Sequence, residues 1–502
     1  MRKGNRIYGI ITVLLLSLGA CSLIHDDMEE LGYREDGSAY AYVSLTIHTG
    51  TAGNVTRANP TGGEDGNGNE KGQDYENAVS DLTLFFYPAA SGIVSGVNQD
   101  DVDFTAKVHI SRIGTSTNVT QQPSNIDKTF TVGPVKVNGL KTNQQYHVLA
   151  VANAGDLADP KKEIVRLDDL RKAEINQVYA FSEQEGYSNF VMASEGDENP
   201  VLEISYENSE TNPAETTINL ERLVARVDYQ VESSYETTTD DANEIEGTVT
   251  IESAALVNDF RGDTYFLKRT GSSVDASEVT YLGDETLNPA NWVVDAFLTS
   301  EKENELYRNY FTSFTSQSDW ESLLKKGDPI MDSAEQTWYR IGYTMENTNQ
   351  VQSESDLENY CTGMVFKAKF VPTNWVGYTE GTTFYRYYNT LYKSISDLQS
   401  LIPNLTEENC NEYGVDVYKD GYCYYTWWIK HNNDDNEAAF GPMEYAIVRN
   451  NIYQLKVTSV AGLGESEPGK SGNIVVIVAV QKWSKLEGED LTFTEDKDRN
   501  VE

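Results

Sequence analysis

The chain has 502 residues and a formal net charge of −40 at pH 7, with 79 acidic and 39 basic side chains. This charge repels nucleic acid phosphates, so we exclude nucleic acid binding as the main function and expect no nucleic acid partner. Hydrophobic residues make up 39% of the chain, enough for substantial cores, and the length suggests two or three domains. The 31 tyrosines, against 13 prolines, favour strands.

The first residues are typical of an exported lipoprotein. Three basic residues precede an apolar run at 10–18, which is shorter than the roughly 20 residues of a membrane-spanning helix. The run ends in LGAC at 18–21, which resembles a bacterial lipobox, in which the Cys21 sulfur receives a diacylglycerol. An ordinary cleavage site with a chance cysteine is the alternative. Ser22 follows the cysteine and favours the outer membrane, so we expect a lipid-anchored precursor there.

A tether and then a strand are expected next. Residues 22–39 are polar and acidic. Over 40–49 apolar and polar side chains alternate, with Val43, Leu45 and Ile47 on one face. Alternation of this kind predicts a strand with one buried face.

An exposed loop is predicted over 50–77, which is rich in Gly, Asn, Glu and Asp and contains Arg57. Some helical character is expected over 155–175, and the polar stretch at 196–215 is the best candidate for a domain boundary. Apolar and β-branched runs predict strands in this half at 82–87, 104–110, 129–137 and 146–152.

The second half is also rich in predicted strands. A short helix is expected at 317–325. No repeat of 20–50 residues is found, and the many short strands and turns predict sandwich-like β domains with minor helix. Strands are expected at 218–229, 249–256, 364–371 and 422–429, and a strand pair or one bent strand is expected at 446–460.

No set of residues predicts catalysis, and we expect neither a cofactor nor a metal. One segment, 464–471, has the spacing of a phosphate-binding loop, but it contains Pro468 and two glutamates and precedes a strand instead of a helix. The five histidines are widely scattered, without the short spacings of zinc ligands. We therefore expect a protein that is not an enzyme.

Two features of the second half leave alternatives open. Cys361, Cys410 and Cys423 are an odd number, so they allow at most one internal disulfide, either between Cys410 and Cys423 or none, with buried free thiols. The aromatic run at 422–428 favours a core strand, and the alternative is a surface that stacks on sugars.

The apolar run from Ile474 to Val480 does not alternate, so both of its faces are expected to be buried. One interpretation is that it completes the sheet of its own domain. The other is that it fills a groove in a neighbouring molecule by strand addition. If strand 40–49 fills such a groove, a cut after Arg57 would empty it for the trailing strand of another copy, and head-to-tail insertion of this kind builds a filament.

Several segments resemble the Bacteroidales fimbrillins, most closely the shaft subunit of short (minor) fimbriae. These segments are AYAYVSLT at 39–46 ahead of TRA at 56–58, RLVAR at 222–226, 364–372, YYTW at 424–427, VRNNIY at 448–453, and the tail at 476–480 with Trp483.

The resemblance implies a fimbrial subunit that polymerises by donor-strand exchange and supports adhesion. The lipidated precursor would be cut by an arginine-specific protease between Arg57 and Ala58, with Arg34 as a second candidate site. Its partners would be other copies of the chain, other fimbrial subunits, the protease and, before cleavage, the outer membrane. A tip or accessory subunit, or a surface glycan-binding lipoprotein that uses the aromatics at 422–428, are alternatives.

The resemblance also implies two transthyretin-like β-sandwich domains and a donor strand. The expected divisions are a signal peptide at 1–21, a propeptide at 22–57, β-sandwich domains at 58–215 and 216–463, and an appendage at 464–502. Val43, Leu45 and Ile47 would line the strand that leaves the groove. The strand that inserts would carry Ile474, Val476, Ile477, Val478, Val480 and Trp483.

Overall fold

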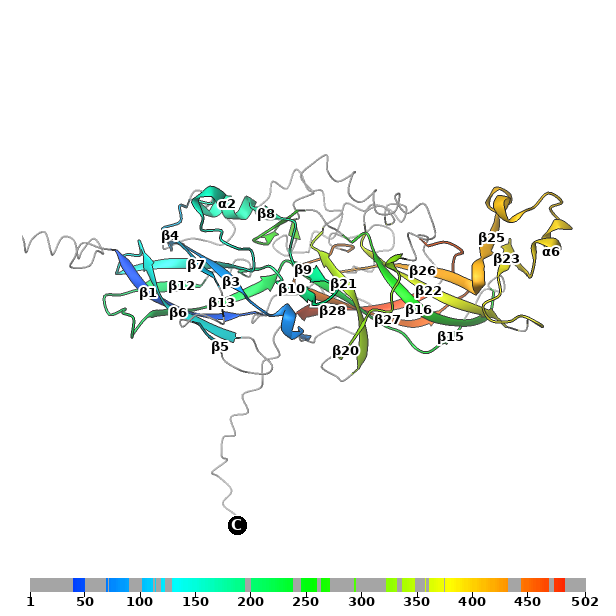
Figure 1. The fold of residues 1–502 in the computed structure, drawn as a ribbon, viewed down its shortest axis with the longest axis horizontal. Helices are drawn as coiled ribbons and strands as arrows, with labels where there is room; N and C mark the ends of the chain where they lie inside the picture. Colours follow the sequence, from blue (N-terminus) through cyan, green and yellow to red (C-terminus); the bar gives the residue numbers. More distant parts are fainter. Residues whose placement is uncertain are drawn as a thin grey trace, which may run out of the picture.

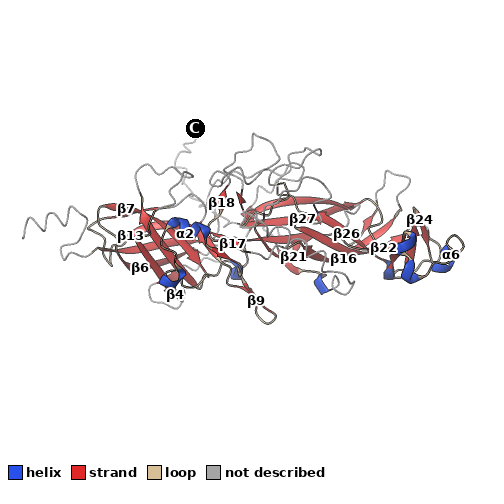
Figure 2. Cartoon of the chain, turned by 90° about the horizontal axis from the view of Figure 1, so that it is seen from above, coloured by secondary structure: helices blue, strands red, loops and turns tan. Residues whose placement is uncertain are grey.

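The computed structural model describes residues 39–49, 69–70, 72–89, 102–111, 113, 119–121, 129–194, 200–237, 245–259, 263–270, 293–294, 322–331, 336–347, 357, 361–373, 375–431, 444–468 and 474–483. The predictions for Cys21, Arg34, Arg57 and Ala58 fall outside these residues. Strands dominate the described chain, as Figure 2 shows, and helices are few and short, so the prediction of a mostly β fold is confirmed.

The first sheet has nine strands. Eight of them lie in the order β4 (Ala106–Ser111), β3 (Asp81–Pro88), β7 (Gln144–Ala152), β11 (Met192–Ser194), β13 (Ala214–Arg222), β1 (Tyr40–His48), β6 (Thr129–Asn138) and β5 (Val119–Gln121), and β12 (Val201–Ile204) pairs with β7. Leu84 and Phe86 of β3 share one buried core with Val43 and Leu45 of β1. Because β3 and β1 are far apart in the strand order, the sheet must curl so that its two ends face each other.

The opposite face of β3 is buried as well. Phe85 packs in a second core with Leu167 and Leu170 of the helix α2 (Leu167–Lys172). The helical character expected over 155–175 is thus confined to α2 and the short 3-10 turn η2 (Pro160–Lys162). Both faces of β3 are therefore covered, which explains its continuous apolar sequence.

Two further sheets face each other in the second half. One has the order β2 (Asn69–Glu70), β28 (Ile474–Trp483), β27 (Asn451–Val460), β14 (Val224–Gln230), β21 (Thr337–Met345) and β20 (Asp328–Met331). The other has the order β15 (Tyr235–Glu236), β16 (Gly247–Val257), β22 (Gly363–Pro372) and β26 (Tyr422–Trp428). Tyr453 and Leu455 of β27 share a core with Phe366 and Phe370 of β22, so the two sheets form a sandwich.

The single strand expected over 218–229 is wrong. Its residues belong to β13 and β14, which lie in different sheets, and the change of sheet is at the buried Leu223, whose backbone N–H donates to the Val191 carbonyl at 3.1 Å. The expected domain boundary at 215–216 falls inside β13. The strand pair or bent strand expected over 446–460 is the one strand β27, which begins at Asn451 because Asn450 has a positive φ of 56° and interrupts the extended backbone.

The helix expected at 317–325 lies largely outside the described residues. In Figure 1 the molecule is long, with the first sheet at one end and β23, β25 and α6 at the other.

The described chain also contains several smaller elements. These smaller elements are η1 (Asp74–Glu76), β8 (Glu174–Ile175) with β17 (Thr264–Tyr265), β9 (Ala180–Ser182) with β10 (Gly186–Ser188), β18 (Arg269–Thr270) with β19 (Val293–Val294), α6 (Ile395–Gln399), the 3-10 turns η5 (Glu407–Asn409), η6 (Asn411–Tyr413) and η7 (Lys419–Gly421), and a sheet of β24 (Thr390–Tyr392), β23 (Phe384–Tyr387) and β25 (Val415–Tyr418).

Candidate functional site

The strand β1 is an internal strand of the first sheet. On one side it pairs in parallel with β13, from Val43 opposite Ala214 to His48 opposite Asn219. On the other side it pairs antiparallel with β6, from Tyr40 opposite Asn138 to His48 opposite Thr129. Removing β1 would therefore leave two strand edges without a partner, and we call the space between β13 and β6 the slot.

The buried face of β1 fills a core. The side chains of Ala41, Val43, Leu45 and Ile47 are at most 2% exposed and pack with apolar residues of β3, β6 and β7. Full burial of a Val, Leu or Ile side chain contributes roughly 1.5–3 kcal/mol each. Burial of Val43, Leu45 and Ile47 together therefore stabilises β1 in the slot by about 5–9 kcal/mol.

The fit of β1 depends on a glycine in β6. The register between the two strands shifts between Val43 and Leu45, where β6 carries Gly133 with φ of +126°. A Cβ atom at Gly133 would lie 2.5 Å from the carbonyl oxygen of Val43 and 2.9 Å from Cα of Ser44. A side chain here would be strained and would collide with β1, so this bulge is shaped around an occupying strand.

The terminal strand β28 completes a sheet of its own chain. It pairs antiparallel with β27, from Ile474 opposite Val460 to Lys482 opposite Asn451. In the described chain, its outer edge pairs only with the two-residue β2, at Lys482 and Trp483. This arrangement agrees with the first of the two interpretations of the sequence, in which the strand completes the sheet of its own domain.

The residues expected in the donor strand all lie on β28: Ile474, Val476, Ile477, Val478, Val480 and Trp483. Among them Val476 is described as buried, 6% exposed, in the core of the sandwich. Because β28 is nearly an edge strand, it can leave this sheet without disturbing the order of the strands behind it.

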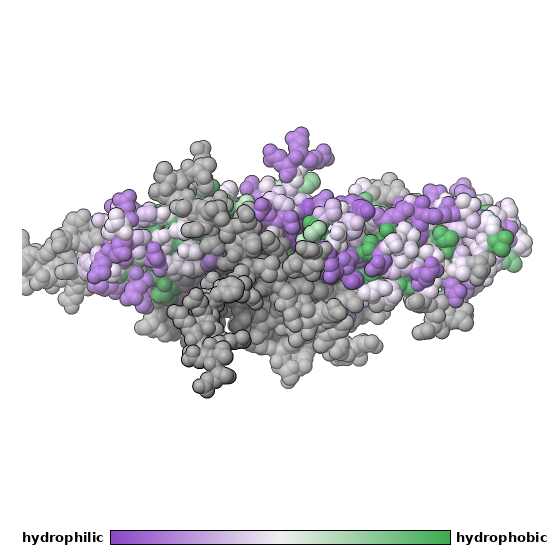
Figure 3. Space-filling model, turned by 90° about the horizontal axis from the view of Figure 1, so that it is seen from below, coloured by the Kyte–Doolittle hydropathy of each residue, from purple (hydrophilic) through white to green (hydrophobic). Residues whose placement is uncertain are grey.

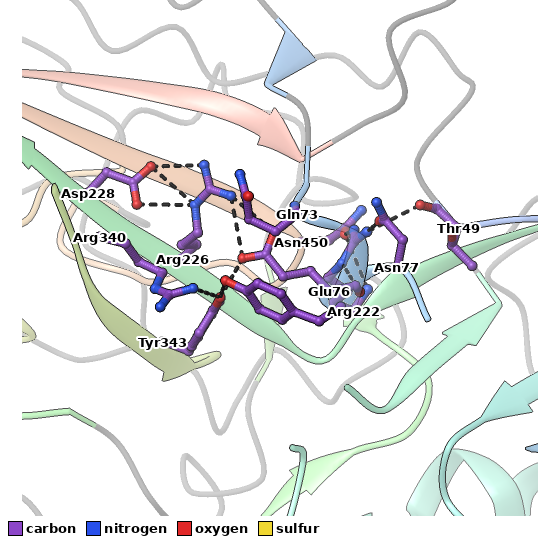
Figure 4. A network of polar contacts seen from close by, with 11 residues as sticks. Thr49, Gln73, Glu76, Asn77, Arg222, Arg226, Asp228, Arg340, Tyr343 and Asn450 are labelled. Atoms are coloured by element: carbon purple, nitrogen blue, oxygen red, sulfur yellow. Dashed lines mark hydrogen bonds and ion pairs between the residues drawn. The ribbon is translucent and has the colours of Figure 1, made fainter. Parts of the chain in front are cut away.

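A buried polar network joins η1 to both halves of the molecule (Figure 4). The Glu76 carboxylate has no exposed surface and lies 3.1 Å from Nη1 of Arg226. Arg226 also contacts Asp228 at 3.0 Å, and the hydroxyl of Tyr343 donates to Glu76. The segment 73–77, which follows Arg57 in the sequence, is thereby fixed inside the protein.

The charges in this network suit the buried position. Burial alone would lower the pKa of Arg226, but Asp228 and Glu76 raise it above its ordinary value. Burial and the charge of Glu76 raise the pKa of Tyr343 well above its usual range, so this phenol remains a hydrogen-bond donor at neutral pH.

Sequence reasoning missed this network. A signal was present, because Arg222 and Arg226 flank the apolar residues 223–225, and arginine is almost never fully buried without a partner. The partner Glu76 lies about 150 residues away in the sequence, in a segment whose composition indicated only a loop.

One family model matches the chain. Residues 416–487 match the C-terminal region of fimbrillin, described as the major fimbrial subunit protein type IV. The chain carries a fimbrillin C-terminal region. The sequence-based assignment to the fimbrillins is thereby confirmed, and the matched segment contains β26, β27 and the whole of β28. The match supports a fimbrial subunit with a structural role, located at the cell surface and associated with other fimbrial subunits.

Solved structures of fimbrial proteins are similar to the chain along most of its length. A fimbrillin from Porphyromonas gingivalis has 12% identity and a TM-score of 0.40, with coverage of 89% of this chain and 98% of that one. A C-terminally truncated tip fimbrial protein from the same species has 13% identity and a TM-score of 0.35, with coverage of 88% and 99%. A fimbrial assembly protein from Parabacteroides distasonis has 10% identity and a TM-score of 0.33, with coverage of 89% and 96%. No curated protein sequence matches the chain significantly.

The aromatic run of the fimbrillin segment lies within the sandwich. Tyr425 has no exposed surface, and Tyr424 and Trp428 are 5% and 6% exposed. The strand β26 pairs with β22 on one side, and Tyr424 forms a bridge with Glu465 on the other. Tyr424, Tyr425 and Trp428 thus belong to a core strand, the interpretation that the sequence favoured, whereas Tyr422 and Trp427 are half-buried.

The three cysteines of the described chain are free and buried. The alternative with a disulfide between Cys410 and Cys423 is therefore wrong, and the two residues pack in different cores. Burial raises the pKa of the Cys423 thiol to about 12, so this thiol is protonated and unreactive.

Within the described residues, no group of three or more His, Cys, Asp or Glu residues is arranged to hold a metal ion. Among the same residues, no helix combines the length and the apolar character that a bilayer span requires.

Proposed function

We propose that the chain is a shaft subunit of a cell-surface fimbria, made as a lipid-anchored precursor and polymerised by protease-triggered donor-strand exchange, and that the fimbria supports adhesion. The observation that carries this proposal is the position of β1. It is internal to the sheet, buried on one face, and joined to the rest of the protein by the segment that contains Arg57.

The first step is a cut between Arg57 and Ala58 by an arginine-specific protease. The cut separates residues 22–57, with β1 and the lipid on Cys21, from the remainder of the chain. The two edges of the slot, on β13 and β6, then accept backbone hydrogen bonds from another strand.

The second step is the entry of β28 from another copy. The match in length supports this step, because β1 has nine residues and β28 has ten. In its own sheet β28 pairs along one whole edge with β27, and its other edge pairs with β2 only at Lys482 and Trp483. The slot offers β28 a partner strand along both edges. Each backbone hydrogen bond contributes about 0.5–1.5 kcal/mol net, so an entering β28 is held more strongly by the two edges of the slot than by the one full edge of its own sheet.

In this scheme the mature subunit has two β-sandwich domains, expected at 58–215 and 216–463 but with the change of sheet at Leu223, and a donor-strand appendage at 464–502. Because the slot and the donor strand are different surfaces of one chain, each copy fills one neighbour and is filled by another, and the assembly grows as an open filament. The family description as a major fimbrial subunit favours the shaft over a tip or accessory role.

The cut site is tested by substitution at the two candidate arginines. Arg57→Ala is expected to leave a lipidated monomer and to abolish the ladder of SDS-resistant oligomers on gels of surface fractions. Arg34→Ala is the matched control and is expected to give a normal ladder. A normal ladder from Arg57→Ala would show that cleavage at this site is not the trigger.

A further inference from the structure

The guanidinium of Arg222 contacts both ends of the segment that carries Arg57. Thr49 follows β1 and Glu76 ends η1, so Arg57 lies between them in the sequence. Nη2 of Arg222 donates to the carbonyl oxygen of Thr49 at 3.2 Å, and Nε donates to the carbonyl oxygen of Glu76 at 3.0 Å (Figure 4). The side-chain oxygen of Asn77 accepts a further hydrogen bond from Nη2.

Arg222 is itself held rigidly at the end of β13. Its side chain is 1% exposed, and Nη1 donates to the Asn450 side-chain oxygen at 3.0 Å. Burial lowers its pKa to about 10, against the opposing charge of Glu76, so the group remains cationic at neutral pH. The planar fork serves several acceptors at fixed angles, and a lysine ammonium does not reproduce that geometry.

The two carbonyl groups that Arg222 binds belong to the backbone on opposite sides of the predicted cut. Neither hydrogen bond requires the chain between Thr49 and Glu76 to be continuous. The bond to Thr49 lies at the end of β1, where the strand would otherwise start to peel out of the slot, and bonds with a charged donor belong to the stronger class.

We propose that Arg222 is a staple that keeps the cut β1 in its slot until a donor strand displaces it. This inference rests on the proposed function, because it assumes the cut after Arg57. Cleavage and strand exchange are then two separate steps. The cut subunit never exposes two bare strand edges, which are templates for aggregation.

The staple is tested on the purified full-length chain, cut in solution by an arginine-specific protease, with N-terminal sequencing to identify the cut. The wild-type fragment that contains 40–49 is expected to co-elute with the body in size exclusion. A synthetic peptide of residues 474–483 is expected to displace it. Arg222→Lys is expected to speed the loss of the fragment about tenfold or more, since it removes charge-assisted hydrogen bonds.

Arg386→Lys is the matched control, because Arg386 pairs with Asp416 in the small sheet at the far end of the molecule. It is expected to retain the fragment like the wild type. Equal retention by Arg222→Lys and the wild type would overturn the proposal.

A measurement on the wild type keeps the proposal testable if Arg222→Lys does not fold. Amide hydrogen exchange of 40–49 is expected to be as slow after cutting as before, and loss of the fragment without any donor peptide would overturn the staple. If the fragment is retained but the 474–483 peptide does not displace it, donor-strand exchange fails while the staple stands. If no cut occurs between residues 49 and 76, both fail.

Discussion

At the scale of single residues, the carboxylate of Glu76 stabilises the centre of the molecule. It has no exposed surface and is balanced by Arg226 and the Tyr343 hydroxyl. Removing one member of a buried pair leaves an uncompensated charge, so Glu76→Gln is expected to lower the free energy of unfolding by about 3–5 kcal/mol. Urea denaturation measures this loss.

A surface glutamate provides the control for Glu76. Glu252 is 40% exposed and lies 3.8 Å from Lys369. Exposed pairs of this kind contribute little, so Glu252→Gln is expected to cost less than about 1 kcal/mol. Similar losses for the two variants would contradict the role given to the buried network.

The half-buried His431 predicts a pH dependence of stability. Burial lowers its pKa to about 4, with a smaller effect from the charge of Lys268, and the hydroxyl of Tyr453 lies 2.9 Å from Nδ1. The unfolded chain takes up the proton below about pH 6.5, whereas the folded chain stays neutral until about pH 4. The contribution of neutral His431 to the free energy of unfolding is therefore fully present above pH 6.5. It falls by about 1.4 kcal/mol per pH unit as the pH decreases from about 6.5 to about 4.

Urea denaturation of the wild type and His431→Gln between pH 7.5 and pH 4.5 isolates this contribution from those of other groups. The variant is expected to lose less stability across this range than the wild type. Parallel curves for the two proteins would show that the folded protein does not keep His431 neutral in this pH range.

At the scale of elements, local patterns predicted many strands but not their partners. Alternation over 40–49 predicted β1 and its buried face, because the side-chain period of a strand is visible in the sequence. Its parallel pairing with β13, about 170 residues away, is not visible there, because it depends on tertiary packing. For the same reason 218–229 was wrongly predicted as one strand, since no glycine or proline marks the change of sheet at Leu223.

The candidate site was predicted in part for similar reasons. The strands β1 and β28 were predicted from the alternation over 40–49 and the apolar run over 474–480. The network of Arg222, Arg226 and Glu76 joins segments that have no sequence pattern in common. The resemblance to fimbrillins indicated the role of the strands but not the contacts that hold β1 and η1 together.

Deletion of residues 472–502 tests the role of β28 as an element. Because β28 is nearly an edge strand, the body is expected to stay folded, with cooperative thermal unfolding at a somewhat lower temperature. The truncated subunit is expected to be cut normally but to form no filament by electron microscopy, since it has no strand to donate. Filaments of normal length would rule out both the donor role and the shaft assignment.

At the scale of the whole molecule, the charge works against assembly. The chain carries a net charge of −40, and the described face in Figure 3 is largely hydrophilic, with hydrophobic atoms in small separate patches. Copies therefore repel one another at long range, and salt screens this repulsion. The rate of polymerisation of cut subunits is expected to rise when the ionic strength increases from about 0.01 to 0.15 M, where the screening length falls from about 30 to 8 Å.

Light scattering during assembly measures this rate, with uncut precursor as the control that stays monomeric at every salt concentration. A rate that falls with added salt would mean that attraction between opposite charges drives the encounter. The repulsion between like-charged subunits would then be the wrong description.

In the proposed assembly, β1 leaves each subunit as it joins a filament. The peptide map and N-terminal sequence of subunits in purified filaments test it most directly. The predicted result is a chain that begins at Ala58, retains the peptide of 474–483 and lacks the peptide of 40–49. Filament subunits that begin at Cys21 and still contain residues 40–49 would contradict the account.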